Sequence, residues 1–298
     1  MSAEPDLRTP RLPAWLKVRA PGGERYARIK STLRNLDLHT VCEEARCPNV
    51  GECWGAGTAT IMVLGDVCTR GCRFCSVTSG NPGGTVDPDE PENVARAVAR
   101  MGLDYVVMTM VDRDDLSDGG AAHVAECVRS IKRHDASVLV EVLSGDWAGD
   151  QAAIRTASES GAEVMAHNIE TVRRLTPAVR DARCGYDLSL DVLRRYKALA
   201  PEGTYTKSSI MVGVGERPDE VLSTMDDLRE VGVDLLTLGQ YLRPTKRHLD
   251  VAEFVHPDDF ERYRREALAR GFRSVASGPL VRSSYRAGEL LIKSLIGL

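Results

Sequence analysis

Apolar runs of strand length alternate with amphipathic segments of helix length through most of this 298-residue chain, and this alternation constrains the fold most tightly. The strand-like runs cover 59–64, 105–110, 138–143, 163–167, 204–212 and 235–238. The helical segments between them cover 92–100, 121–133, 150–160, 188–199 and 219–231. Near-continuous apolar strands separated by such helices predict βαβ units and a parallel sheet. Six units are too few to close an eight-stranded barrel, so we expect a partial (β/α)6 barrel, open on one side.

Three cysteines directly follow the first predicted strand. Cys68, Cys72 and Cys75, here called the second cysteine set, fall within eight residues. A [4Fe-4S] cluster is usually held by four thiolates, so a loop that supplies three leaves one iron open to another ligand. Functional groups of parallel sheets gather at the carboxyl ends of the strands, which is where this loop is expected.

A structural zinc site and a disulfide are less economical assignments for this cysteine set. A zinc site would need a fourth Cys or His nearby, and His39 and His123 do not have zinc-finger spacing. A disulfide would need an oxidising compartment and usually a small, loop-rich domain.

A second group of three cysteines lies upstream of the predicted barrel. Cys42, Cys47 and Cys53, here called the first cysteine set, are separated by four and then five residues. Pro48 and Gly51 should prevent a regular helix and let the loop curl, so that the three sulfurs converge. A second cluster is the economical interpretation, with a shared single cluster and some free thiols as the alternative. Some other residue, or the substrate, must then complete its coordination.

The composition argues for a reducing compartment and against two classes of partner. Six of the eight cysteines lie between positions 42 and 75, which favours metal binding over disulfides, while Cys127 and Cys184 are predicted to be small buried side chains. The net charge of -4 and the pI near 5.9 provide no basic field for nucleic acid or an anionic membrane. No apolar segment is long enough to span a membrane, and the first residues lack signal-peptide features. We therefore expect a cytoplasmic protein.

Polar residues follow several of the predicted strands. Residues 112–118 hold four carboxylates, which could equally be a solvated loop that caps a helix. Asn168 and Glu170 follow the fourth strand, where they suit a zwitterionic amino acid and a ribose. Gly213 follows the fifth strand and would allow a planar ligand to approach the backbone closely.

The spacing of the second cysteine set resembles that of the radical S-adenosylmethionine (SAM) superfamily. Further stretches follow in order: His-Asn-Ile-Glu-Thr at 167–171, Gln-Tyr-Leu-Arg-Pro at 240–244 and Arg-Ser-Ser-Tyr-Arg at 282–286. Together with both cysteine sets, they make the chain resemble the lipoyl synthase family from about Trp15 to Gly288.

This resemblance implies a radical SAM sulfurtransferase that inserts sulfur at C6 and C8 of an octanoyl chain on a lysine of a lipoyl carrier domain. It implies that the second set, Cys68, Cys72 and Cys75, binds the [4Fe-4S] cluster that cleaves SAM to a 5'-deoxyadenosyl radical. It also implies that the first set, Cys42, Cys47 and Cys53, binds an auxiliary [4Fe-4S] cluster whose sulfides enter the product. Ser284 would be the fourth ligand of that auxiliary cluster, and two SAM molecules would be consumed per lipoyl group.

The predicted organisation has three parts: an N-terminal extension over 1–58 with the first cysteine set, a partial radical SAM barrel over 59–270, and a C-terminal segment over 271–298 that supplies Ser284. Asn168, Glu170 and Gly213 are the predicted SAM contacts. The implied partners are octanoylated carrier domains (2-oxoacid dehydrogenase E2 or glycine cleavage H protein), a low-potential donor such as ferredoxin or flavodoxin, and a cluster-repair protein. We expect neither nucleic acid nor a membrane as a partner.

Two alternative functions remain. A biotin-synthase-like sulfur insertion would not explain the Arg-Ser-Ser-Tyr motif. An iron-sulfur carrier would leave most of the barrel without a purpose, and carriers generally complete their clusters with four cysteines. Formation of 5'-deoxyadenosine from SAM distinguishes an enzyme from a carrier.

Overall fold

The structure is a computed structural model that describes residues 12–18, 22–36, 38–44, 47–55 and 60–284. Its main sheet has the strand order β1-β2-β5-β6-β7-β8-β9-β10. Neighbouring strands from β2 to β10 pair in parallel, whereas β1 pairs with β2 in the antiparallel sense. The strands are β1 (His39–Thr40), β2 (Thr60–Val63), β5 (Tyr105–Met110), β6 (Leu139–Leu143), β7 (Val164–Ala166), β8 (Tyr205–Val212), β9 (Leu235–Gln240) and β10 (Ser274–Gly278).

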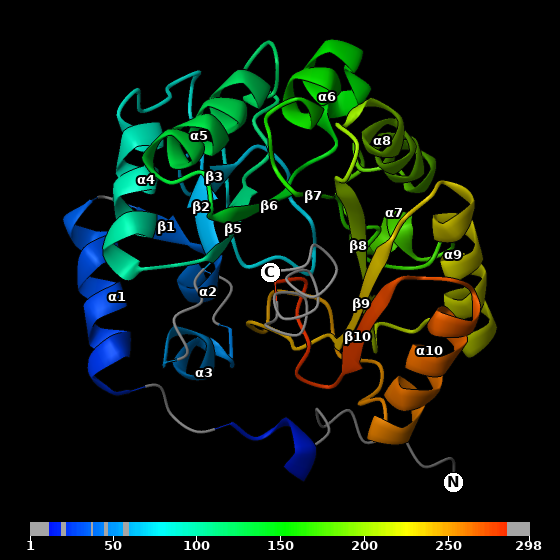
Figure 1. The fold of residues 1–298 in the computed structure, drawn as a ribbon. Coiled ribbons are helices and arrows are strands. Elements are labelled where there is room, and N and C mark those ends of the chain that lie inside the picture. The colour runs from blue at the N-terminus through cyan, green and yellow to red at the C-terminus, as the bar shows by residue number, and fades with distance from the viewer. Residues whose placement is uncertain (1–11, 19–21, 37, 45–46, 56–59, 285–298) are drawn as a thin grey trace, which may run out of the picture.

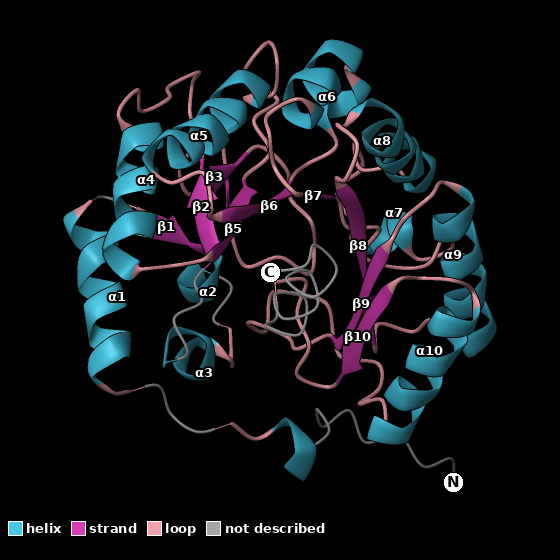
Figure 2. Cartoon of the chain, in the orientation of Figure 1, coloured by secondary structure: helices cyan, strands magenta, loops and turns pink. Residues whose placement is uncertain are grey.

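Helices cover the outer face of the curved sheet (Figure 1). The longer ones are α1 (Glu24–Asn35), α4 (Glu90–Met101), α5 (Ala121–His134), α6 (Gln151–Ser158), α8 (Tyr186–Leu199), α9 (Pro218–Glu230) and α10 (Pro257–Ala269). Figure 2 shows the same arrangement by secondary structure, with strands inside and an arc of helices outside. The predicted partial barrel is therefore confirmed.

The predicted strand count was too low. The structure adds β10, which pairs with β9 from Ser274 opposite Leu235 to Gly278 opposite Gly239, and the short edge strand β1. The sequence of β10, Ser-Val-Ala-Ser-Gly, lacks the apolar run of a buried parallel strand. Its burial is correspondingly mixed, so pairing with β9 rather than side-chain pattern fixes it as a strand.

Local sequence signals explain well where the predicted elements begin and end. The helix α4 has a proline in its first turn and ends at Gly102, whose φ of 60° is the left-handed conformation typical of a helix C-cap. The following strand β5 reads Tyr-Val-Val-Met-Thr-Met, and its first five residues are buried. Burial on both faces of the sheet explains why this run is continuous rather than alternating.

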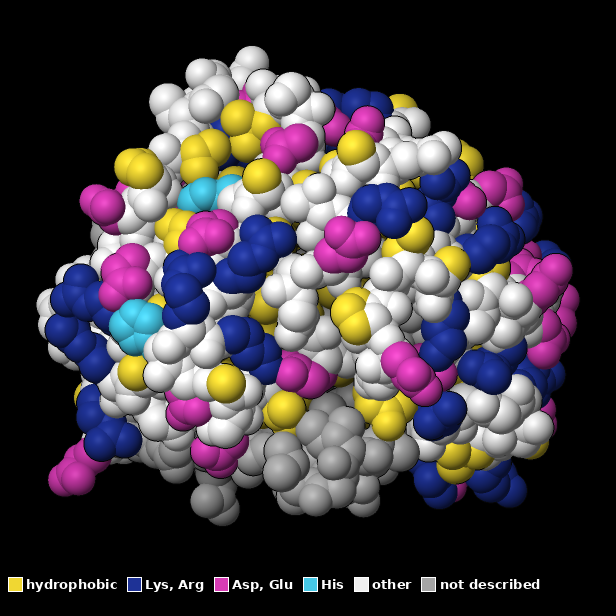
Figure 3. Space-filling model, turned by 45° about the horizontal axis from the view of Figure 1, so that its top comes forward, with side chains coloured by type: hydrophobic (Ala, Val, Ile, Leu, Met, Phe, Trp, Pro, Cys, Tyr) yellow, Lys and Arg dark blue, Asp and Glu magenta, His cyan; other side chains and the backbone are white. Residues whose placement is uncertain are grey.

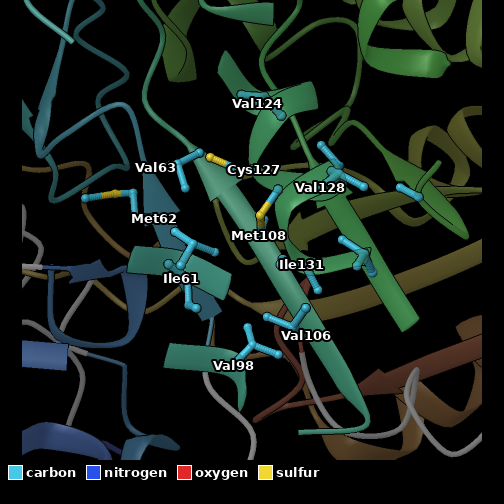
Figure 4. Packing of buried hydrophobic residues seen from close by; sticks show 14 of the residues in the cluster. Ile61, Met62, Val63, Val98, Val106, Met108, Val124, Cys127, Val128 and Ile131 are labelled. Carbon is cyan, nitrogen blue, oxygen red and sulfur yellow. The ribbon is translucent and has the colours of Figure 1, made fainter. Parts of the chain in front are cut away.

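The larger hydrophobic core lies between the first strands and helices α4 and α5. Figure 4 shows Ile61, Val106 and Met108 of the sheet facing Val128 and Ile131 of α5. Fully burying a side chain of this size contributes about 1.5–3 kcal/mol relative to leaving it exposed. A second core joins β8 and β9 to α9 and α10, so each side of the barrel has its own apolar support.

A buried ion pair lies inside the barrel toward the amino ends of its strands. Lys207 of β8 donates to both carboxylate oxygens of Glu141 of β6, at 2.7 and 2.8 Å. The Tyr105 hydroxyl donates to the same carboxylate at 2.5 Å. Because the charges are paired and hydrogen-bonded, the polar group is tolerated in the interior. This cluster lies at the end of the barrel opposite the strand ends that hold the predicted site.

Part of the N-terminal extension packs against the body of the protein. Leu16 is buried, and the ring of Trp15 packs edge-on against His256, with centroids 5.3 Å apart. Residues 1–11 of this extension, Tyr285 and Arg286 of the Arg-Ser-Ser-Tyr-Arg stretch, and residues 289–298 lie outside the described residues.

In the view of Figure 3, basic and acidic side chains are interspersed over the surface and hydrophobic ones are scattered among them. Within the described ranges, no helix is both long and apolar enough to cross a membrane.

Candidate active site

A cavity of about 510 Å³ lies at the carboxyl ends of the parallel strands. Its lining includes the ends of β5, β6, β7, β8 and β9, as the parallel-sheet rule requires. All seven predicted cluster ligands line it: Cys42, Cys47, Cys53, Cys68, Cys72, Cys75 and Ser284. Two groups of residues far apart in sequence therefore share one cavity.

The second cysteine set is held by a short strand pair and by backbone bonds to the barrel. The strands β3 (Val67–Cys68) and β4 (Thr78–Ser79) pair in parallel, and Gly80 N donates to Cys68 O at 2.9 Å. Thr69 N donates to Asp112 O at 2.9 Å, which fixes the loop to the end of β5. The loop is therefore anchored at the carboxyl end of the sheet, where it was predicted.

Burial makes two of these thiols, Cys68 and Cys75, harder to ionise in the absence of metal. Burial raises the pKa of Cys75 to about 11, and burial together with the nearby Asp112 raises the pKa of Cys68. Thiolate is the form that ligates metal, so metal binding at this loop releases protons. Three soft sulfur donors in one cavity wall are the donor chemistry that an iron-sulfur cluster requires.

Arg70, between the first two cysteines of this set, organises the acidic loop that follows β5. Its side chain is 2% exposed and lies 2.9 Å from Asp114, 2.6 Å from Asp146 and 3.7 Å from Asp112. Burial raises the pKa of Asp112 to about 6, whereas the hydrogen bond from Arg70 keeps the pKa of Asp114 below its ordinary value.

The acidic loop over 112–118 both supports the cluster loop and caps a helix, as its sequence suggested for the cap. Asp112 and Asp114 fix the cluster loop through Arg70. Asp118 instead caps α5 by accepting from Gly120 N and Ala122 N, both at 2.9 Å.

Two members of the first cysteine set, Cys42 and Cys53, lie on short helices, contrary to the expectation that Pro48 and Gly51 would exclude helix, and Cys47 lies between these helices. These are α2 (Val41–Glu44) and α3 (Val50–Gly55), and Gly51 lies inside α3. Pro48 falls between them, where its missing N–H breaks no helical bond. Cys47 N donates to Cys42 O at 3.0 Å and Cys53 N donates to Asn49 O at 2.8 Å, so the chain still curls around the three sulfurs.

The segment that ends in Ser284 reaches this set because Gly239 of β9 has no side chain. A Cβ at Gly239 would lie 2.0 Å from Val281 O, so only glycine permits this close approach. The guanidinium of Arg282 interacts electrostatically with Cys47, and its Nη1 donates to Gln240 O at 3.2 Å. Asn49 Nδ2 donates to Leu280 O at 2.6 Å, which ties the cysteine loop to the same segment.

Two of the three predicted SAM contacts line the cavity. Asn168 Nδ2 donates to Glu170 Oε1 at 3.0 Å, and Glu170 has a positive φ of 66°. Burial raises the pKa of Glu170. The neighbouring His167 is a satisfied core residue: it contacts Ser144 O at 3.0 Å and Ser189 Oγ at 2.9 Å, and burial lowers its pKa to about 4.

Gly213, the third predicted contact, is not among the lining residues. It has a φ of 95°, and a Cβ there would lie 2.1 Å from Gln240 Nε2. Its N–H donates to Glu216 Oε1 at 2.5 Å. Packing at the end of β8 therefore accounts for the glycine, and its contact with SAM stays a prediction.

Cys184 is a cavity residue that sequence reasoning did not assign. It is buried as predicted, but its Sγ lies 4.0 Å from Cys72 Sγ and accepts from Arg70 Nη1 at 3.3 Å. No local motif marks it, because residues 72 and 184 meet only in the folded barrel.

A further group with metal-binding side chains, Glu90, His123 and Cys127, lies away from the cavity. Glu90 Oε2 already accepts from Leu64 N at 2.9 Å and contacts His123 Nε2 at 2.6 Å. These contacts give the pair a structural role, which is to hold the turn after β2 against α5. Cys127 is fully buried, as predicted.

Comparison with known proteins assigns the chain to a family. Residues 62–228 match the Radical SAM superfamily, and residues 3–47 match the N-terminal domain of lipoyl synthase of the Radical SAM family. A lipoyl synthase from Anaeromyxobacter dehalogenans is 58% identical, over 95% of this chain and 96% of that protein. The mitochondrial lipoyl synthase of Arabidopsis thaliana is 57% identical, over 95% of this chain and 77% of that protein.

The chain belongs to the lipoyl synthase family. It is an enzyme, a radical SAM sulfurtransferase that inserts two sulfur atoms at C6 and C8 of a protein-bound octanoyl chain. Its cofactors are two [4Fe-4S] clusters, and SAM is its cosubstrate. The predictions of fold, function and cofactors from the sequence are thus confirmed.

Solved structures support the fold. Methylornithine synthase matches with a TM-score of 0.55 at 15% identity, over 84% of this chain and 77% of its own. SuiB of Streptococcus suis bound to SAM matches with a TM-score of 0.55 at 10% identity, over 76% of this chain and 53% of SuiB.

Proposed function

We propose that the two cysteine sets hold the two clusters of this lipoyl synthase on opposite walls of one cavity. Cys68, Cys72 and Cys75 hold the cluster that binds SAM, beside Asn168 and Glu170. Cys42, Cys47, Cys53 and Ser284 hold the auxiliary cluster. The single observation that supports this most strongly is that all seven ligands line one cavity although they come from three separate parts of the chain.

A single cavity suits the reaction. When bound, the clusters and SAM supply a radical that opens unactivated C–H bonds and the sulfur that replaces hydrogen. The protein must then hold the octanoyl chain between the two ligand sets, so that the carbon radical meets sulfur before it meets water. The residues Met62, Met110, Val111 and Ile210 give part of the lining an apolar surface that fits an alkyl chain.

Charge at the auxiliary site is balanced by the chain itself. Arg282 contacts Cys47, and burial lowers the pKa of its guanidinium while the thiol opposes this shift. Ser284 contributes a hydroxyl, whereas soft thiolate is the commoner ligand of cluster iron. An oxygen ligand is more easily protonated and released, which suits a cluster that gives up sulfur.

The partners follow from this chemistry. We propose lipoyl carrier domains (2-oxoacid dehydrogenase E2 or glycine cleavage H protein) as substrates, a low-potential donor such as ferredoxin or flavodoxin, and a protein that rebuilds the consumed cluster. We further propose a cytoplasmic location and the division of the chain at residues 58 and 270.

Iron analysis tests the ligand assignment. The anaerobically reconstituted enzyme should contain about eight irons per chain, since each cysteine set holds a four-iron cluster. Cys47→Ala and Cys72→Ala should each contain about four, because each variant loses a different cluster. A maximum near four irons in the parent would exclude the two-cluster arrangement.

Ser284 and Ser283 provide a matched pair, since both line the cavity. Ser284→Ala should lower iron at the auxiliary site and the yield of thiolated product, while Ser283→Ala should be milder. The reverse order of effects would contradict the assignment of Ser284.

A further inference from the structure

One edge of the cavity wall carries exposed cations that have no acidic partner. Arg73, Lys246 and Arg247, here called the basic rim, are exposed, and none forms an ion pair with a carboxylate of the described residues. Arg243 and Arg183 nearby differ, because they pair with Asp250 and Asp181. The chain as a whole has a net charge of -4, so this local excess of positive charge runs against its composition.

Hydrogen bonds from His248 and Leu249, which directly follow Lys246 and Arg247, fix this turn to the loop of the second cysteine set. Leu249 N donates to Arg73 O at 3.2 Å, and His248 Nε2 contacts Cys75 O at 3.0 Å. Arg243 holds the shape of the loop by donating to Thr245 O at 3.1 Å and to Lys246 O at 2.6 Å. Lys246 and Arg247 are thus presented by an ordered turn, directly beside the loop that holds Cys72 and Cys75.

We infer that the basic rim is the docking surface for the negatively charged protein that reduces the SAM cluster. This inference rests on the proposed function of Cys68, Cys72 and Cys75. Electron transfer needs a short path, and the rim borders the loop that would hold the electron acceptor. Interfaces between electron-transfer proteins are small and short-lived, and complementary charge on the two partners speeds their association. Each encounter transfers one electron: the donor is oxidised by one and the cluster is reduced by one.

The octanoyl carrier domain is the competing occupant. It must deliver its acyl chain to the sulfur source, which the proposed function places on residues 42–53. The rim instead lies beside the other set: Arg73 is within that loop, and His248 and Leu249, which follow Lys246 and Arg247, hydrogen-bond the carbonyl oxygens of Cys75 and Arg73. Proximity to the electron acceptor therefore favours the reductant.

The test variant is Lys246→Glu/Arg247→Glu. Its matched control is Arg96→Glu/Arg100→Glu, which reverses the same number of exposed charges on the outer helix α4. Stopped-flow absorbance would follow reduction of the oxidised enzyme by reduced flavodoxin, an acidic one-electron donor, at low and physiological salt. Calorimetry without SAM would measure binding of oxidised flavodoxin. Dithionite, a small reductant, would drive SAM cleavage independently of docking.

The rim variant should be reduced by flavodoxin about 10-fold or more slowly at low salt, and should lose most of the salt dependence seen in the parent. Its flavodoxin binding should weaken in parallel, while SAM cleavage with dithionite and the control variant should match the parent. Reduction at the parental rate, or equal slowing of the control, would overturn the inference. So would a raised KM for the octanoylated carrier with unchanged reduction, which would assign the rim to the carrier. If the parent enzyme does not cleave SAM with dithionite, the proposed function itself is contradicted.

Discussion

Cys72→Ala is expected to abolish SAM cleavage, whereas Cys47→Ala is expected to retain SAM cleavage and make no thiolated product. Both cysteines line one cavity, so simple damage to the site would affect both activities alike. The proposed ligand sets predict a difference in kind, because only the set with Cys72 holds the cluster that binds SAM. Removing one thiolate from a three-cysteine loop leaves too few protein ligands for that cluster.

Chromatography of 5'-deoxyadenosine and mass spectrometry of the octanoyl peptide would measure the two activities in the same reaction. Cys127→Ala is the control, since this thiol is buried among hydrophobic residues away from the cavity. It should retain both activities. If Cys47→Ala still thiolates the octanoyl chain, the first set is not the sulfur source.

Arg70→Met is expected to destabilise the protein by about 3–5 kcal/mol near neutral pH, because it removes the partner of buried carboxylates. The side chains of Arg70 and Asp146 are almost fully buried, and Arg70 Nη1 lies 2.6 Å from Asp146 Oδ2. Arg70 Nη2 also lies 2.9 Å from Asp114 Oδ1. The matched control is Arg183→Met, which loses ion pairs to the same Asp114 at 3.0 Å and to Asp181 at 2.9 Å, but from a side chain that is 49% exposed. An exposed pair contributes about 0–1 kcal/mol, so the control should change little.

The cost of Arg70→Met should also depend on pH. In the parent, the hydrogen bond from Arg70 lowers the pKa of Asp114. Burial acts to raise the pKa of Asp146, but its hydrogen bond and ion pair with Arg70 outweigh burial and lower it. A lowered folded-state pKa stabilises above the unfolded value and is lost as the pH falls through the folded value. Without Arg70, burial would raise the pKa of Asp146, so protonation of this carboxylate would relieve the penalty in acid. Thermal unfolding under anaerobic conditions should show the largest difference at about pH 7–8 and a smaller one near pH 5; equal differences would contradict this electrostatic account.

The barrel could be predicted from sequence because its strands are locally distinct. The run from Tyr105 to Met110 was located to the residue, since it is a continuous apolar segment preceded by a glycine-capped helix. The strand β10 was missed because its small, partly polar residues depend on β9 for their structure. Helix α10, which precedes it, was missed as well.

The site divides in the same way. The two cysteine sets are local patterns, so their spacing could be interpreted directly. The bond of Arg70 to Asp146, the approach of Cys184 to Cys72, and the contact of Arg282 with Cys47 join residues far apart in sequence. Such contacts form only when the whole barrel folds, and no single segment encodes them. The approach of Val281 to Gly239 had a possible signal, the glycine in β9, but a strand glycine can have several structural causes.

Mass spectrometry of an octanoyl-lysyl peptide after anaerobic turnover tests the central claim most directly. With excess SAM and dithionite, the enzyme should add two sulfur atoms to the octanoyl chain and release two molecules of 5'-deoxyadenosine for each lipoyl group formed. Enzyme reconstituted with ³⁴S-labelled sulfide and then freed of excess sulfide should place that label in the product, because the sulfur comes from the protein-bound cluster. Release of 5'-deoxyadenosine without any gain of sulfur, or product sulfur without the label, would contradict the account.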